Sequence, residues 1–94
     1  VAGSDLYVFK ATKKTVNFTI DLNPDNDSTR AAVKAELLSF LLRDGYPEGT
    51  LELSRINEAI SIAAGEHSHK LISPAADTPI AKNELAVMGT ITWA

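Results

Sequence analysis

With 94 residues, the chain has room for one domain, since domains commonly run to about 100–150 residues. A hydrophobic fraction of 45% favours a folded chain over a disordered one, and the lack of cysteine excludes disulfides and thiolate metal sites. The net charge of −3 offers no basic surface for nucleic acid, and no apolar run approaches the roughly 18–20 residues that span a bilayer.

The first fourteen residues show no regular pattern. Leu6 to Phe9 would form a short strand, but the lysines that follow do not alternate with apolar residues. We therefore expect residues 1–14 to be a junction with a preceding domain or an extra strand. Residues 15–94 are expected to form a single α+β domain.

A clear strand pattern begins at Thr15. Apolar and polar residues alternate there with a period of two, which is typical of a strand with one buried face. A turn sequence containing Pro24 ends this strand, and Asp27 or Ser28 is placed to cap the helix that follows. The apolar residues of the strand are Val16, Phe18, Ile20 and Leu22.

The first helix is expected to end at Gly45, because glycine adopts the left-handed conformation that often terminates a helix. Its apolar face is wider than one sheet normally needs, since Leu38 and Leu42 flank the main stripe. This extra width indicates contact with a second element or with a partner chain. The main stripe consists of Val33, Leu37, Phe40 and Leu41.

A connector then leads to a second helix. The segment from Leu51 to Leu53 would form a short strand, and Ser54 is the expected N-cap of the helix. Gly65 is expected to close it. The apolar residues follow the spacing of a one-sided helix and are Ile56, Ala59, Ile60, Ala63 and Ala64.

Two further strands complete the chain. Residues 67–73 alternate only in part, whereas residues 85–93 alternate throughout. The predicted fold is α+β, with a small antiparallel sheet of about three strands in the order β-α-α-β-β and both helices packed on one face. In the last strand, one face is predicted to hold Leu85, Val87, Gly89, Ile91 and Trp93.

The two histidines are the first candidates for chemistry. His67 and His69 stand at alternate positions and would point to the same side of a strand, where Glu66 or Asp77 would supply a third zinc ligand. We favour a pair of solvent-facing residues, since nothing else in the chain has ligand spacing. The sequence contains no nucleophile motif and no phosphate-binding loop, so we expect no enzyme, no catalytic residue, no metal and no cofactor.

Some apolar residues fall outside the predicted core. Ile62 lies off the apolar face of the second helix, and Tyr7 and Phe9 lie near the start of the chain. Together with Leu38 and Leu42, these residues are candidates for an interface. Trp93 would suit an interface as well, but its phase in the last strand favours a place in the core.

Several segments resemble the C-terminal domain of baseplate J-like proteins, which are known from Mu-like and P2-like phages with contractile tails. The first is VNFTIDLNP, from Val16 to Pro24, with a long helix after it. GTLELSRINEAI, from Gly49 to Ile60, resembles the approach to the family's second helix, and Ala63 to Gly65 its end. SPAAD and ELAVMGTITW, which begin at Ser73 and Glu84, complete the resemblance in the expected order.

The resemblance implies a structural, non-catalytic component of a phage or prophage baseplate, which assembles as part of a wedge and transmits the contraction trigger. The implied partners are other tail proteins and copies of the parent protein, without nucleic acid or membrane. The implied location is the virion tail, assembled in the host cytoplasm.

We expect the isolated domain to be a monomer or weak dimer, because repeated copies around a ring strengthen individually weak contacts. The alternative is a free-standing ligand-binding or regulatory domain of ferredoxin-like topology. Such a domain would need a small-molecule pocket between the sheet and the helices.

Overall fold

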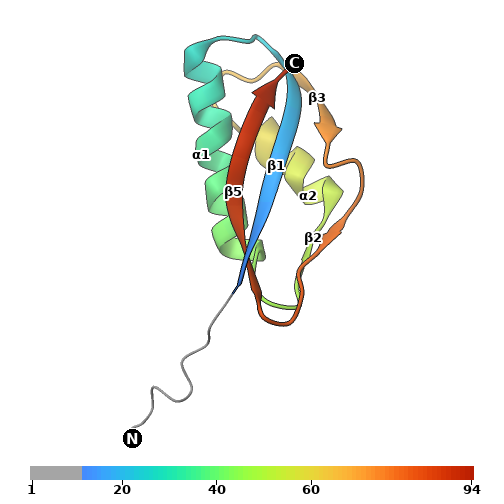
Figure 1. The fold of residues 1–94 in the computed structure, drawn as a ribbon. Coiled ribbons are helices and arrows are strands. Elements are labelled where there is room, and N and C mark those ends of the chain that lie inside the picture. The colour runs from blue at the N-terminus through green and yellow to red at the C-terminus, as the bar shows by residue number, and fades with distance from the viewer. Residues whose placement is uncertain (1–11) are drawn as a thin grey trace, which may run out of the picture.

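The computed structural model of the chain describes residues 12–94. Tyr7 and Phe9 lie outside the described residues. The elements are β1 (Thr12–Asn23), α1 (Asp27–Asp44), β2 (Thr50–Leu51), α2 (Leu53–Ser61), β3 (Ser68–Ser73), β4 (Thr78–Pro79) and β5 (Glu84–Trp93), as shown in Figure 1.

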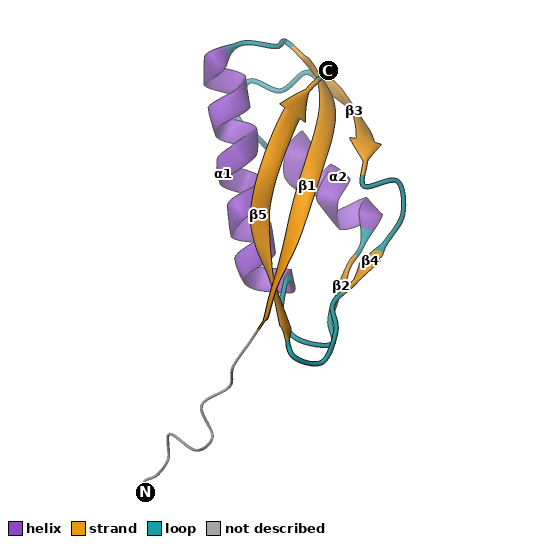
Figure 2. Cartoon of the chain, in the orientation of Figure 1, coloured by secondary structure: helices purple, strands orange, loops and turns teal. Residues whose placement is uncertain are grey.

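The fold has two layers. One layer is a three-stranded sheet in the order β3-β1-β5, and β2 pairs with β4 as a separate two-stranded ribbon. Both helices lie behind the same face of the three-stranded sheet (Figure 2). The α+β class, the three-stranded sheet and the placement of both helices on one face are therefore confirmed.

The strand directions differ from the prediction, because the sheet is mixed rather than antiparallel. β1 pairs with β3 in antiparallel orientation but with β5 in parallel orientation. After β4, the chain returns to the end of the sheet where β1 begins, and the Thr12 amide donates to the Asn83 carbonyl over 2.7 Å. β5 then runs in the same direction as β1. Alternation reports which face of a strand is buried and carries no information on the direction of its neighbour.

β5 also changes phase part-way along its length. Val16 of β1 lies opposite Met88, whereas Phe18 lies opposite Ile91, so β5 contains one additional residue between these pairs. Such a bulge reverses the faces on which later side chains lie. Ala86 and Met88 therefore pack on the core together with Ile91 and Trp93, and the prediction that Leu85 and Val87 share a face with Trp93 is wrong.

The hydrophobic core lies between the sheet and the helices. Its largest fully buried side chains include Phe18 from β1 and Phe40 from α1. Every apolar residue predicted for the inner face of β1 and for the main stripe of α1 is buried, which confirms both patterns. Among residues 12–94, the buried core consists of Val16, Phe18, Ile20, Leu22, Val33, Leu37, Phe40, Leu41, Leu51, Ile56, Ala59, Ile60, Ala63 and Ile80.

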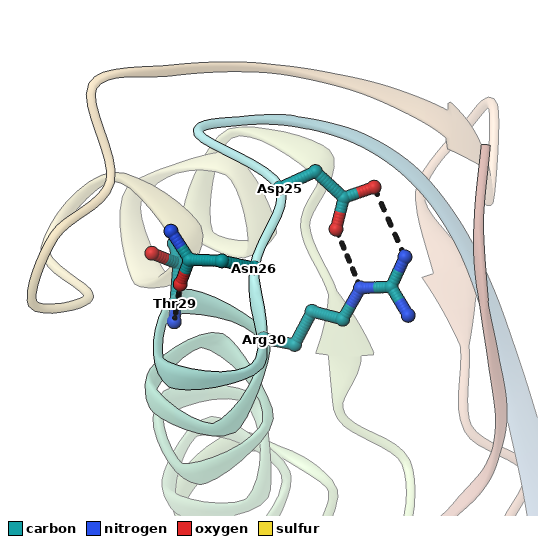
Figure 3. A network of polar contacts seen from close by, with 4 residues as sticks. All are labelled: Asp25, Asn26, Thr29 and Arg30. Carbon is teal, nitrogen blue, oxygen red and sulfur yellow. Dashed lines mark hydrogen bonds and ion pairs between the residues drawn. The ribbon is translucent and has the colours of Figure 1, made fainter.

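The cap of α1 is Asn26, one residue before the predicted candidates. Its side-chain oxygen accepts a hydrogen bond from the Thr29 amide over 2.8 Å (Figure 3). Asp27 and Ser28 already lie within the helix. The expectation that one of them caps the helix is therefore wrong, because several adjacent residues have capping side chains and only the backbone geometry selects one.

The second helix begins earlier than predicted and is capped from a distance. α2 starts at Leu53, and its N-cap residue Glu52 makes no side-chain capping bond. The Leu53 amide instead donates to Oδ1 of Asp77 over 2.8 Å. Ser54 is therefore inside the helix and does not cap it. The acceptor lies 24 residues away, beyond the reach of a local pattern.

Gly45 follows α1 as predicted, but for a different reason. Its φ of −87° is not left-handed. A Cβ at this position would approach the Leu41 carbonyl oxygen to 2.5 Å and the Ala86 Cβ to 2.6 Å, so the glycine allows the helix to meet β5 closely. Gly65 does adopt a positive φ of 87°, although α2 itself already ends at Ser61.

Candidate interaction surface

Among the residues that the structure describes, the most exposed large apolar side chain belongs to α1. Leu42 is 90% exposed and Leu38 is 41% exposed, and both lie on the side of the helix that faces away from the sheet. Ala31 and Ala35 are also exposed and precede them at spacings of four, three and four residues. We call these four residues the outer face of α1. They align along the helix because about 3.6 residues make one turn.

This arrangement makes α1 apolar on two opposite sides. Its inner side carries Val33, Leu37 and Phe40, which are fully buried. Charged residues such as Lys34 and Arg43 are also exposed on this helix, between its two apolar sides. The outer face of α1 is therefore a narrow apolar strip on the solvent side of the helix.

The third described interface candidate, Ile62, lies just after α2. It is 63% exposed and is the C-cap residue of that helix. Ile62 belongs to a different element from Leu38 and Leu42, so the structure provides these candidates on two separate elements. Sequence patterns missed three further exposed apolar residues, which are Tyr46, Ile72 and Leu85. Leu85 was predicted to lie on the core face together with Ile91. Because of the bulge in β5, the two residues lie on opposite faces, and Leu85 is exposed.

The histidines occupy different environments. His67 precedes β3 and is exposed, whereas the side chain of His69 is 10% exposed. Nδ1 of His69 lies 2.7 Å from Oε2 of Glu66, and Nε2 lies 2.9 Å from Oδ1 of Asn57. These contacts tie β3 to α2 and to the turn that follows it. The prediction that His69 is solvent-facing is wrong, and both of its ring nitrogens already have protein partners.

Within residues 12–94, the structure shows neither a cluster of metal-ligating side chains nor a pocket. No three His, Asp or Glu side chains in this part of the chain come close enough together to hold a metal ion. No pocket is found between the sheet and the helices, where a ligand-binding domain would need one. None of the described helices is long and apolar enough to cross a bilayer.

Charged groups gather where α1 begins and β5 ends. Both oxygens of the Asp25 carboxylate accept hydrogen bonds from Arg30, with Nη2 3.0 Å from Oδ2 (Figure 3). These hydrogen bonds lower the pKa of Asp25 and raise that of Arg30. The Arg30 guanidinium also lies over the Trp93 ring, 5.3 Å from its centre. Trp93 is half-buried and packs on the core, in agreement with its predicted place.

The comparisons with known proteins identify the family. The model of the baseplate J-like protein C-terminal domain matches residues 16–94. The chain belongs to the baseplate J-like family. The match includes β1 from Val16 onward, both helices and β5, and therefore covers the residues that form the core and the outer face of α1.

Two relatives are longer than this chain, and the chain matches only part of each. The chain is 62% identical over 93 residues to the Escherichia coli K12 protein JayE, covering 99% of this chain and 35% of JayE. It is 36% identical over 92 residues to the Mu-like prophage FluMu protein gp47 of Haemophilus influenzae, covering 98% of this chain and 26% of gp47. The chain thus spans about a third or less of these relatives.

Proposed function

We propose that the chain is a structural, non-catalytic part of a phage or prophage contractile-tail baseplate and acts through protein–protein contacts. The observation that carries this proposal is the outer face of α1, with Leu42 90% exposed in a domain of the baseplate J-like family. Exposed apolar residues that line up on one face mark interaction sites more often than isolated ones do.

The proposed contacts use two separate elements. Leu38 and Leu42 on α1 form one contact, and Ile62 after α2 forms another. A domain with two contact sites can join two neighbours in a ring, and repetition of weak contacts around that ring makes the assembly stable. The proposed partners are other tail proteins and copies of the parent protein. Tyr7 and Phe9 remain predicted interface residues.

The place of the domain in the particle follows from this role. We propose that it belongs to a baseplate wedge, which is assembled in the host cytoplasm and transmits the contraction trigger. In this proposal residues 15–94 form the domain, β1 extends it back to Thr12, and the residues before β1 connect it to a preceding domain or add a strand. The tight packing between α1 and β5 at Gly45 supports a rigid unit, because rigid contacts transmit displacement between neighbours.

The test is a deletion in the phage or prophage that carries the gene. Codons for residues 16–94 are removed, and contractile tails are counted by electron microscopy after induction. Peptides of the intact chain are sought in purified tails by mass spectrometry. The proposal predicts that the intact chain copurifies with tails and that the deletion abolishes complete tails. Normal tails after the deletion would overturn it.

A further inference from the structure

A small polar network joins β3 to α2. His69 belongs to β3, Asn57 belongs to α2, and Glu66 lies in the turn between these two elements. We call these three residues the His69 network. Only 10% of the His69 side chain and 6% of the Glu66 side chain are exposed. Because water has little access to this site, the groups that face one another must satisfy each other's hydrogen bonds.

The Asn57 amide determines the proton on one side of the ring. Its Nδ2 donates to the Leu53 carbonyl oxygen over 3.0 Å. A reversed amide would bring two oxygens together there, so Oδ1 is the atom that faces Nε2 of His69, at 2.9 Å. An amide oxygen accepts hydrogen bonds and does not donate them. Nε2 of His69 therefore carries a proton.

Glu66 requires a second proton on the other side of the ring. Nδ1 of His69 lies 2.7 Å from Oε2 of Glu66, and neither a carboxylate oxygen nor an unprotonated ring nitrogen donates a hydrogen bond. Isolated histidine has a pKa of about 6.5 and isolated glutamate one of about 4.3, so the ring nitrogen is the stronger base and holds the proton. We infer that the His69 network is a proton-dependent latch between β3 and α2, in which the ring carries a proton on both nitrogens.

The other charged groups around His69 are remote from this contact. Among residues 12–94, Glu66 is the one ion-pair partner of His69, and on β1 the residue opposite His69 is the apolar Leu22. Exposed charges act on the ring through water, which weakens them relative to a direct contact. The charged or titratable residues on the neighbouring elements are all exposed and are Asp21 on β1, Arg55 and Glu58 on α2, His67 and Lys70 beside His69, and Asp77 at the start of α2.

Removal of the second proton would open the latch. The Nδ1 lone pair and the Glu66 carboxylate would then face each other as two acceptors, and a buried acceptor without a donor is costly. A histidine in the unfolded chain has a pKa of about 6.5 and gives up this proton as the pH rises, whereas the folded chain holds it for the contact. The stabilisation is therefore complete below about pH 6 and declines above about pH 7.

The variant Glu66→Gln tests the role of the proton. Its amide nitrogen donates to an unprotonated Nδ1, so the variant keeps the contact without the second proton. Urea denaturation is measured from about pH 5.5 to about pH 8.5 for the natural chain, for Glu66→Gln and for His67→Gln, which changes the exposed histidine nearby. Above about pH 6.5, the unfolding constant of the natural chain should rise relative to that of Glu66→Gln, by up to about tenfold per pH unit. His67→Gln should follow the natural chain.

The same pH dependence in Glu66→Gln and in the natural chain would overturn the inference. A second measurement needs no change in the network. Nitrogen–proton correlation spectra of the natural chain at about pH 7.5, where an isolated histidine is largely neutral, report the protons on each ring. The chain has two histidines, so the spectrum of His67→Gln assigns the signals of His69. Protons on both nitrogens of His69 are expected, and an unprotonated Nδ1 would also overturn the inference.

Discussion

Gly89 is the residue at which the bulge of β5 depends most on the absence of a side chain. A Cβ there would approach Oδ1 of Asn17 to 2.0 Å and the Thr15 Cγ2 to 2.7 Å. The Asn17 oxygen cannot move away at no cost, because it accepts a hydrogen bond from the Thr90 amide over 2.8 Å. We therefore expect Gly89→Ala to lower the free energy of unfolding by about 1–3 kcal/mol, measured by urea denaturation.

A double-mutant cycle separates this clash from a general effect of the substitution. Asn17→Ala removes the crowding oxygen and leaves the Thr90 amide without its acceptor. The loss for Gly89→Ala should be smaller in the Asn17→Ala background than in the natural chain. Equal losses in both backgrounds would show that Asn17 is not the obstacle.

Asp25 and Arg30 predict an acid dependence of stability. The hydrogen bonds from Arg30 lower the pKa of Asp25 in the folded state, whereas an aspartate side chain in the unfolded chain has a pKa of about 3.9. The pair therefore stabilises the fold above that pH, and its contribution is lost as the pH falls through the lower folded pKa. Because both groups are exposed, the effect is small.

The variant Asp25→Asn checks this sign. Thermal unfolding should show the natural chain more stable than the variant at neutral pH, with the difference shrinking as the pH falls below about 4. Arg30→Gln should show the same shrinking component, together with a constant loss from its stacking on Trp93. A difference that stays unchanged down to pH ~2 would rule out this ion pair as its source.

At the level of elements, the start of α1 allows a direct comparison between two residues that lie two positions apart. Asn26 supplies the capping oxygen, while Ser28 lies inside the first turn and is exposed. Asn26→Ala is expected to lower the free energy of unfolding by about 1 kcal/mol, since it removes an acceptor for a helix amide. Ser28→Ala, the matched control, should change it by only a few tenths of that amount. Urea denaturation that ranks them in the opposite order would contradict the assignment.

The elements also show which parts of the fold local patterns predict. Alternation placed Phe18 in the core, and helical spacing did the same for Phe40, because one element alone determines which side chains share a face. The cap of α2 by Asp77 and the bulge opposite Asn17 depend on residues distant in sequence. The same limit explains why the parallel direction of β5 was not predicted.

At the scale of the whole molecule, surface and chemistry differ in how far the sequence predicts them. The exposure of Ile62 was predicted, since it lies off the regular apolar face of α2, whereas Leu38 and Leu42 were expected only to widen the apolar stripe of α1. The environment of His69 was not, because its partners Asn57 and Glu66 come from α2 and a turn that only the fold brings to β3. The resemblance to baseplate J-like proteins identified the family, which no local motif indicates.

The central claim is that the domain acts through an apolar surface that becomes covered in an assembled tail. Leu42→Cys tests it most directly, because the chain has no other cysteine and this position is 90% exposed in the isolated domain. Maleimide labelling is timed in the free chain and in purified tails, with Lys82→Cys as the exposed control. Fast labelling at position 42 in the free chain and strong protection in tails is the predicted result. Equal labelling rates in both states, or tails that lack the chain, would contradict the claim.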